Sequence, residues 1–142
     1  MKILIVNGPN LNLLGKRQPE IYGSRSFDDY LEDLEKEYPM HKLVYYQSNH
    51  EGFLVDFIQQ NAQDADGLIL NAGGLTHTSV SLADAIATLS IPTIEVHISN
   101  IFSREPFRHH SFLSPVCNGM ICGLGLTGYS LAINYIVQSH IS

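Results

Sequence analysis

Short apolar runs alternate along the chain with segments in which apolar residues recur every three or four positions. The apolar runs are rich in Ile, Leu and Val, as is typical of strands that a parallel sheet buries on both faces. These runs predict five strands, at residues 2–7, 43–47, 68–71, 93–97 and 119–123. The periodic segments predict four helices, at residues 26–38, 53–62, 80–89 and 129–139.

Strict alternation of strand and helix favours parallel pairing with right-handed crossovers. In 142 residues it predicts one α/β domain, a flavodoxin-like three-layer sandwich with a five-stranded parallel sheet. Such folds bind ligands beyond the carboxyl ends of their strands. Three of those ends are polar here, at Asn7, Asn71 and His97. The long loops at residues 8–25 and 98–118 are expected to act as lids or binding elements.

The composition narrows the range of partners. A net charge of −6 argues against nucleic-acid binding, because no basic excess is present to neutralise phosphates. No apolar run approaches membrane-spanning length, and the first residues do not have the pattern of a signal peptide. Cys117 and Cys122 lack the spacing of a zinc site or a disulfide framework, which favours free thiols and a cytoplasmic protein.

Two motifs point to other ligands but fit poorly. The stretch 123–128 matches G-x-G-x-x-G after a strand, yet no acidic residue follows about 20 positions later, as dinucleotide binding requires. Those glycines are expected to let the last helix pack closely on the sheet. A cluster of His97, His109, His110 and Glu95 matches no standard zinc spacing, so no metal is expected.

A phenol, an imidazole and loop arginines remain as candidate reactive groups. A nearby cation such as Arg17 would favour the phenolate form of Tyr22, which could then act as a base. An imidazole such as that of His97 can donate a proton to a leaving hydroxyl group. Glu95 lies two positions before His97 on one face of a strand, where it can orient the imidazole. Together these groups could eliminate water from a β-hydroxy ketone.

Five sequence blocks resemble, in this order, those of the type II 3-dehydroquinate dehydratases. They are residues 3–23, 70–79, 94–100, 104–111 and 123–129. The resemblance covers essentially the whole chain. It implies a flavodoxin-like fold and no metal or organic cofactor. It also implies dehydration of 3-dehydroquinate to 3-dehydroshikimate, in the shikimate pathway of aromatic biosynthesis, by anti elimination through an enolate.

The resemblance also implies catalytic roles for individual residues. Tyr22 would take the C2 proton of the substrate, and Arg17 would favour its phenolate and stabilise the developing charge. His97 would protonate the leaving C1 hydroxyl group. Asn10 would help to hold a water molecule that stabilises the enolate, and Glu95 would orient catalytic groups through hydrogen bonds.

Substrate-binding roles follow from the same resemblance. The side-chain amide of Asn71 and the backbone amides of Ile98 and Ser99 would bind the substrate carboxylate. His77 and Arg108 would bind ring hydroxyl groups.

The resemblance further implies an assembly. Members of this family are typically homododecamers, built as tetramers of trimers. In such a trimer Asp84 would reach the site of the neighbouring subunit. Arg104 lies on a loop that would close near Tyr22.

Two other interpretations of the sequence stay open at this point. A non-catalytic flavodoxin-like module that binds a nucleotide or small anion would carry a Ser-, Thr- and Gly-rich loop after its first strand. The stretch 7–12, Asn-Gly-Pro-Asn-Leu-Asn, is a poor version of such a loop. A family member kept only as a scaffold would have little reason to retain Tyr22, Arg17 and His97.

Overall fold

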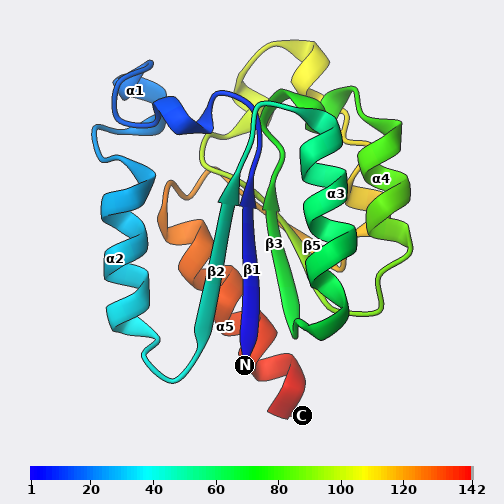
Figure 1. The fold of residues 1–142 in the computed structure, drawn as a ribbon. Coiled ribbons are helices and arrows are strands. Elements are labelled where there is room, and N and C mark those ends of the chain that lie inside the picture. Colours follow the sequence, from blue (N-terminus) through cyan, green and yellow to red (C-terminus); the bar gives the residue numbers. More distant parts are fainter. Residues whose placement is uncertain (142) are drawn as a thin grey trace.

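The sheet is entirely parallel. The computed structural model describes residues 1–141, and within them five strands pair in the order β2-β1-β3-β4-β5 (Figure 1). Their bounds are β1 (Lys2–Asn7), β2 (Lys42–Gln47), β3 (Gly67–Asn71), β4 (Thr93–His97) and β5 (Gly119–Cys122). This is the strand order of flavodoxin-like sheets, so the predicted fold class is confirmed.

Helices cover both faces of the sheet. One face is covered by α2 (Phe27–Glu37) and α5 (Thr127–Ile141), and the other by α3 (Glu51–Asn61) and α4 (Val80–Ala87) (Figure 1). A single-turn helix, α1 (Pro19–Tyr22), lies apart from these layers at the edge where the strands end. Among residues 1–141, no helix is long and apolar enough to cross a membrane.

The side chains of β1 show why the strands are continuously apolar. Ile3 and Ile5 belong to the buried cluster formed with α2 and α5, whereas Leu4 and Val6 belong to the cluster formed with α3 and α4. All four are fully buried. Successive side chains of a strand point to opposite faces, so a strand covered on both faces needs apolar residues throughout. Each such burial stabilises the fold by about 1.5–3 kcal/mol.

Local signals set the helix starts. The Ser26 hydroxyl accepts a hydrogen bond from the Asp29 backbone N–H at 3.2 Å, and the Ser79 hydroxyl accepts one from Leu82 at 2.9 Å. These N-caps satisfy backbone donors that the first helical turn leaves free. Helix α3 begins at Glu51, two residues before the predicted start. The prediction placed the start too late because the first turn of this helix is exposed and carries no apolar periodicity.

Both long loops contain short helical turns that periodicity could not reveal. A turn of three to five residues is too short to show an apolar stripe. In addition to α1, the structure has 3₁₀ turns in these loops at Leu11–Leu13, Ile101–Ser103, Pro106–His109 and Ser114–Val116.

A glycine in the first turn of α5 acts in packing. A Cβ atom at Gly128 would lie 3.3 Å from the side chains of both Ile121 and Val96. The absence of a side chain at Gly128 therefore lets α5 approach β4 and β5 closely, as expected for this glycine. Gly123 and Gly125 instead adopt positive φ angles of 85° and 63° in the turn before α5.

The loops that follow β1 and β3 are in direct contact. The Gly8 backbone N–H donates a hydrogen bond to the Asn71 carbonyl oxygen at 2.7 Å. A Cβ atom at Gly8 would lie only 2.4 Å from the carbonyl oxygen of Ala72. Because that neighbour is backbone, it cannot move aside as a flexible side chain could. Gly8 thus sets the spacing of the two strand ends.

We expect Gly8→Ala to lower the free energy of unfolding by about 1–3 kcal/mol, as overpacking of a filled site does. The matched control is Gly52→Ala, since a Cβ atom at Gly52 would have no neighbour within 4 Å. Denaturant unfolding of both variants measures the difference. Equal stability of Gly8→Ala and the wild-type protein would show that the two loops can separate without cost.

Candidate active site

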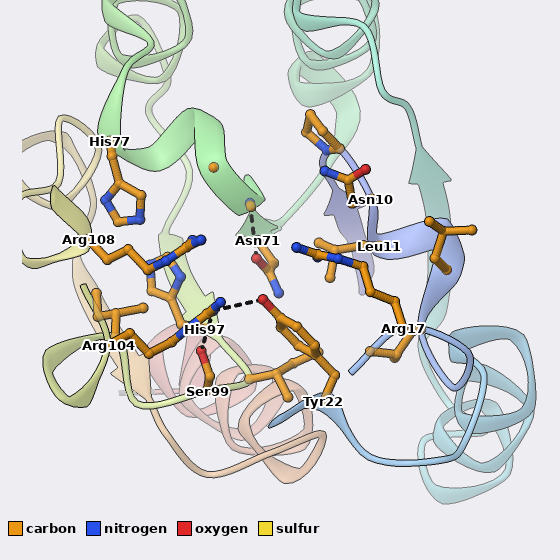
Figure 2. Close-up of a pocket in the computed structure, with 17 residues that line it drawn as sticks. Asn10, Leu11, Arg17, Tyr22, Asn71, His77, His97, Ser99, Arg104 and Arg108 are labelled. Carbon is orange, nitrogen blue, oxygen red and sulfur yellow. Dashed lines mark hydrogen bonds between the residues drawn. The ribbon is translucent and has the colours of Figure 1, made fainter. Parts of the chain in front are cut away.

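A pocket opens at the carboxyl edge of the sheet, beyond β1, β3 and β4. Its walls come from α1 and from the segments that follow these three strands (Figure 2). The predicted site residues that line it are Asn10, Arg17, Tyr22, Asn71, His77, His97, Ile98, Ser99, Arg104 and Arg108. The apolar side chains of Leu11, Leu13, Leu14 and Ile101 also line it. Most of the residues singled out in the sequence therefore meet in one place.

Tyr22 lies between two guanidinium groups. The Arg17 Cζ atom is 5.5 Å from the centroid of the Tyr22 ring, and the Arg104 Cζ atom is 5.4 Å from it. Arg104 also donates a hydrogen bond from Nη1 to the Tyr22 hydroxyl at 2.7 Å (Figure 2). The expected neighbour Arg17 is present, and Arg104 provides the direct hydrogen bond.

A buried carboxylate supports His97. Glu95 is fully buried, and its Oε2 atom accepts a hydrogen bond from His97 Nε2 at 2.5 Å. The Ser114 hydroxyl donates to Glu95 Oε1 at 2.5 Å, and the Ser111 hydroxyl lies 3.1 Å from both carboxylate oxygens. Burial alone would raise the pKa of Glu95, but the hydrogen bonds from His97, Ser114 and Ser111 outweigh it, and the pKa is lowered. The carboxylate is therefore ionised at neutral pH.

The contact with Glu95 assigns the two ring nitrogens of His97. An ionised carboxylate only accepts hydrogen bonds, so Nε2 must carry a proton. Nδ1 is then the nitrogen available to a molecule in the pocket. The bond to a buried carboxylate also fixes the orientation of the His97 ring.

The segment after β4 forms another wall. Ser99 accepts a hydrogen bond at its hydroxyl from Arg104 Nη1 at 3.2 Å, so Arg104 joins this wall to Tyr22. Asn71, at the end of β3, is nearly fully buried at the base of the pocket. Its Oδ1 atom accepts a hydrogen bond from the Gly73 backbone N–H at 3.2 Å (Figure 2).

His77 and Arg108 form the remaining polar side. His77 Nδ1 donates to the His110 carbonyl oxygen at 2.7 Å, which leaves Nε2 for a ligand. Burial lowers the pKa of His77, against the opposing effect of that hydrogen bond. His77 therefore presents a neutral imidazole at neutral pH. Arg108 donates from Nε to Glu105 at 3.2 Å.

Two of the predicted residues lie outside the pocket wall, and a third lines it from an exposed position. Glu95 lies behind His97 rather than in the pocket wall. Asp84 is exposed on α4 and does not line the pocket of its own chain. Asn10 lines the pocket but is exposed, in a left-handed backbone conformation with φ 71°, and its N–H donates to Asn49 Oδ1 at 2.9 Å.

Ser111 and Ser114 were not predicted as site residues. Ser111 lies at the end of a sequence block that carries the family resemblance, which was a usable signal. Ser114 has no such signal, because its contact with Glu95 depends on how the segment after β4 folds back.

Two of the three histidines of the metal hypothesis have separate hydrogen-bond partners. His97 is bonded to Glu95, whereas His109 Nε2 lies 3.1 Å from the Arg104 carbonyl oxygen. In the described part of the chain, no group of three or more His, Cys, Asp or Glu side chains could hold a metal ion. Glu95 and His97 therefore form a hydrogen-bonded carboxylate–imidazole pair.

The fold and the pocket define the class: an α/β protein with a pocket of polar and ionisable side chains at the carboxyl edge of its parallel sheet. The model of the dehydroquinase class II family matches residues 1–137. A 3-dehydroquinate dehydratase of Bacillus pumilus is 52% identical over 137 residues, which cover 95% of this chain and 93% of that protein. One of Dinoroseobacter shibae is 53% identical over 138 residues, covering 96% and 92% respectively.

Solved structures agree with the sequence relatives. The crystal structure of a type II dehydroquinase from Butyrivibrio crossotus superposes with a TM-score of 0.93 at 45% identity. The match covers 96% of this chain and 97% of that one. The chain belongs to the dehydroquinase class II family and is, like its relatives, a hydro-lyase.

We expect Glu95→Gln to lower the free energy of unfolding by about 2 kcal/mol at neutral pH, because hydrogen bonds to a charged group are lost. Since folding lowers the pKa of Glu95, its ionised form stabilises the protein above the ordinary value of 4.5. That contribution is lost as pH falls through the lowered pKa. The difference from the wild-type protein should therefore shrink on acidification.

Denaturant unfolding at several pH values measures this difference. Glu35→Gln is the matched control, because Glu35 is exposed on α2 and should show little change. A Glu95→Gln deficit that is the same at every pH would contradict the assignment of an ionised carboxylate.

Proposed function

We propose that the protein dehydrates 3-dehydroquinate to 3-dehydroshikimate through an enolate. The main support is that a phenol, a carboxylate-bound imidazole and three guanidinium groups surround one pocket. The names of the sequence relatives point to the same substrate. In the reaction a proton leaves C2, a hydroxyl leaves C1, and one water molecule is lost. The proposed reaction is a step of the shikimate pathway, and the same elimination also serves the breakdown of quinate.

Tyr22 is the base of this mechanism. Its phenolate removes the C2 proton, and the electron pair of the C–H bond passes into the enolate. Arg17 and Arg104 stabilise the phenolate, Arg17 across the ring and Arg104 at the hydroxyl oxygen. Asn10 holds a water molecule that donates to the enolate oxygen, a contribution of the oxyanion-hole type.

His97 is the acid. Its Nδ1 proton passes to the C1 hydroxyl as the C1–O bond breaks, and the enolate electrons form the new C1–C2 double bond. Glu95 keeps the proton on Nε2 and stabilises the imidazolium before transfer. Afterwards the proton that Tyr22 removed returns to His97 through solvent, which restores the enzyme.

The remaining polar groups would bind the substrate. The Asn71 amide and the backbone N–H groups of Ile98 and Ser99 bind the carboxylate. His77 and Arg108 bind the ring hydroxyl groups, His77 through Nε2. These groups hold C2 near Tyr22 and C1 near His97, so binding also orients the reaction.

The proposal includes a cytoplasmic homododecamer, a tetramer of trimers, that needs no metal or organic cofactor. The exposure of Asp84 on α4, outside the pocket of its own chain, supports a role at a neighbouring subunit. In the trimer Asp84 would complete the site of that neighbour.

The purified protein is expected to convert 3-dehydroquinate without any added cofactor and in the presence of a chelator. The product is a conjugated enone, so its ultraviolet absorbance follows the reaction directly. Absence of turnover by the folded protein would contradict the proposal and favour a small-molecule binding module. Activity that a chelator removes and added metal restores would contradict the cofactor-free mechanism.

Tyr22→Phe should lower kcat by about 10²–10⁴-fold, the usual contribution of a general base. The fold should survive, because Tyr22 is only partly buried. Tyr135→Phe is the matched control, since that tyrosine is 47% exposed on α5 and outside the pocket. Near-normal turnover of Tyr22→Phe would assign the base to another group.

A further inference from the structure

A chain of hydrogen bonds runs beneath the pocket through the buried core. The Asn71 Nδ2 atom donates to the Tyr129 hydroxyl at 2.9 Å, and that hydroxyl donates to Asn7 Oδ1 at 2.8 Å. Asn7 Nδ2 in turn donates to the Tyr45 hydroxyl at 3.3 Å. Tyr129 and Asn7 are fully buried and neither lines the pocket. Among the residues joined by these hydrogen bonds, Asn71 lines the pocket.

The single hydroxyl proton of Tyr129 gives this series of hydrogen bonds a direction. Because that proton goes to Asn7, the Tyr129 oxygen can only accept from Asn71, and so selects the NH₂ end of the Asn71 amide. The Gly73 N–H independently selects the oxygen end. The side-chain amide of Asn71 is thus held at both its nitrogen and its oxygen, and the second Nδ2 hydrogen remains available to a ligand in the pocket. Either contact alone would leave the amide freer to rotate.

The hydroxyl of Tyr129 is not needed to fill space. The ring packs edge-on against Phe27 with centroids 4.9 Å apart, a contact that phenylalanine would also make. Burial holds the pKa of Tyr129 well above its ordinary value, despite hydrogen bonds that lower it, so the hydroxyl keeps its proton. A buried hydroxyl must be paired to offset the cost of its desolvation. Here its partners are two strand-end asparagines.

We infer that Tyr129 and Asn7 are positioning residues, which hold the Asn71 amide in the single orientation that presents Nδ2 to the substrate. The inference rests on the proposed role of Asn71 in binding the substrate. Tyr129 contacts no substrate and acts only through Asn71. Loss of its hydroxyl therefore weakens substrate binding and leaves the proton transfers at Tyr22 and His97 unchanged.

The test is a double-mutant cycle of Tyr129→Phe with Asn71→Ala. Tyr129→Phe alone should raise KM about three- to tenfold and change kcat little, as loss of a binding contact does. In the Asn71→Ala background it should have no further effect on KM, although it should still lower Tm. An equal KM increase in both backgrounds, or no increase in the single variant, would overturn the inference.

Two further variants complete the design. Asn7→Ala removes the acceptor of the Tyr129 proton, which frees that proton to turn toward Asn71, and it should raise KM in the same Asn71-dependent way. Tyr38→Phe is the matched control, because its hydroxyl bonds Ser130 and Asn134 away from the pocket. It should lower Tm and leave KM unchanged.

A crystal structure of Tyr129→Phe separates this inference from the proposed function. The Asn71 amide should be rotated or present in two orientations. An unchanged, single orientation would overturn the inference whether or not the wild-type protein turns over 3-dehydroquinate. Failure of the wild-type assay would overturn the proposed function without affecting this structural result.

Discussion

The parallel pairing of β1 with β3 is the constraint on which the site depends. Asn7 and Asn71 are partners in its register, so two loops with different courses begin side by side. The chain turns to opposite sides of the sheet at this point, because β2 lies beyond β1 and β4 lies beyond β3. Loops that diverge from neighbouring strand ends leave a crevice between them. The pocket occupies that crevice, and the contact of Gly8 with Asn71 fixes its base.

The base and the walls of the pocket are built differently. Asn71 and His97 form the base, and buried Asn7 and Glu95 lie behind it; each of the four has hydrogen-bond partners within the fold. Such networks are costly when incomplete and rigid when satisfied. The walls carry partly buried charged groups, Arg17 on the loop before α1 and Arg104 and Arg108 on the segment after β4. The base therefore fixes orientation, and the walls supply charge.

The local features of the fold could be predicted from the sequence, because they depend on neighbouring residues. Apolar runs gave the strands, and the Ser26 cap gave the start of α2. The pair Glu95 and His97 followed from their spacing on one strand. The short helical segments inside the long loops left no periodic signal, so α1 and the 3₁₀ turns were missed.

Contacts between distant segments could not be predicted in this way. Arg104 bonds the Tyr22 hydroxyl across 82 positions, and Tyr129 bonds Asn71 across 58. Ser114 reaches Glu95 only because the segment after β4 folds back over the strand. Each contact depends on the packing of several elements at once, and no local pattern encodes that packing. The family resemblance placed Arg104 on a loop near Tyr22, but it supplied neither the Tyr129 contact nor the Ser114 contact.

The charge of the chain and the charge of the pocket have opposite signs. The net charge is −6, yet of the four arginines in the sequence, Arg17, Arg104 and Arg108 line the pocket. The carboxylate oxygens of buried Glu95 accept hydrogen bonds from His97 and two hydroxyl groups and do not face the cavity. Exposed carboxylates elsewhere are screened by salt beyond about 8–10 Å. A small anion inside the pocket therefore experiences mainly the guanidinium groups, whereas a polyanion spread over the surface would be repelled.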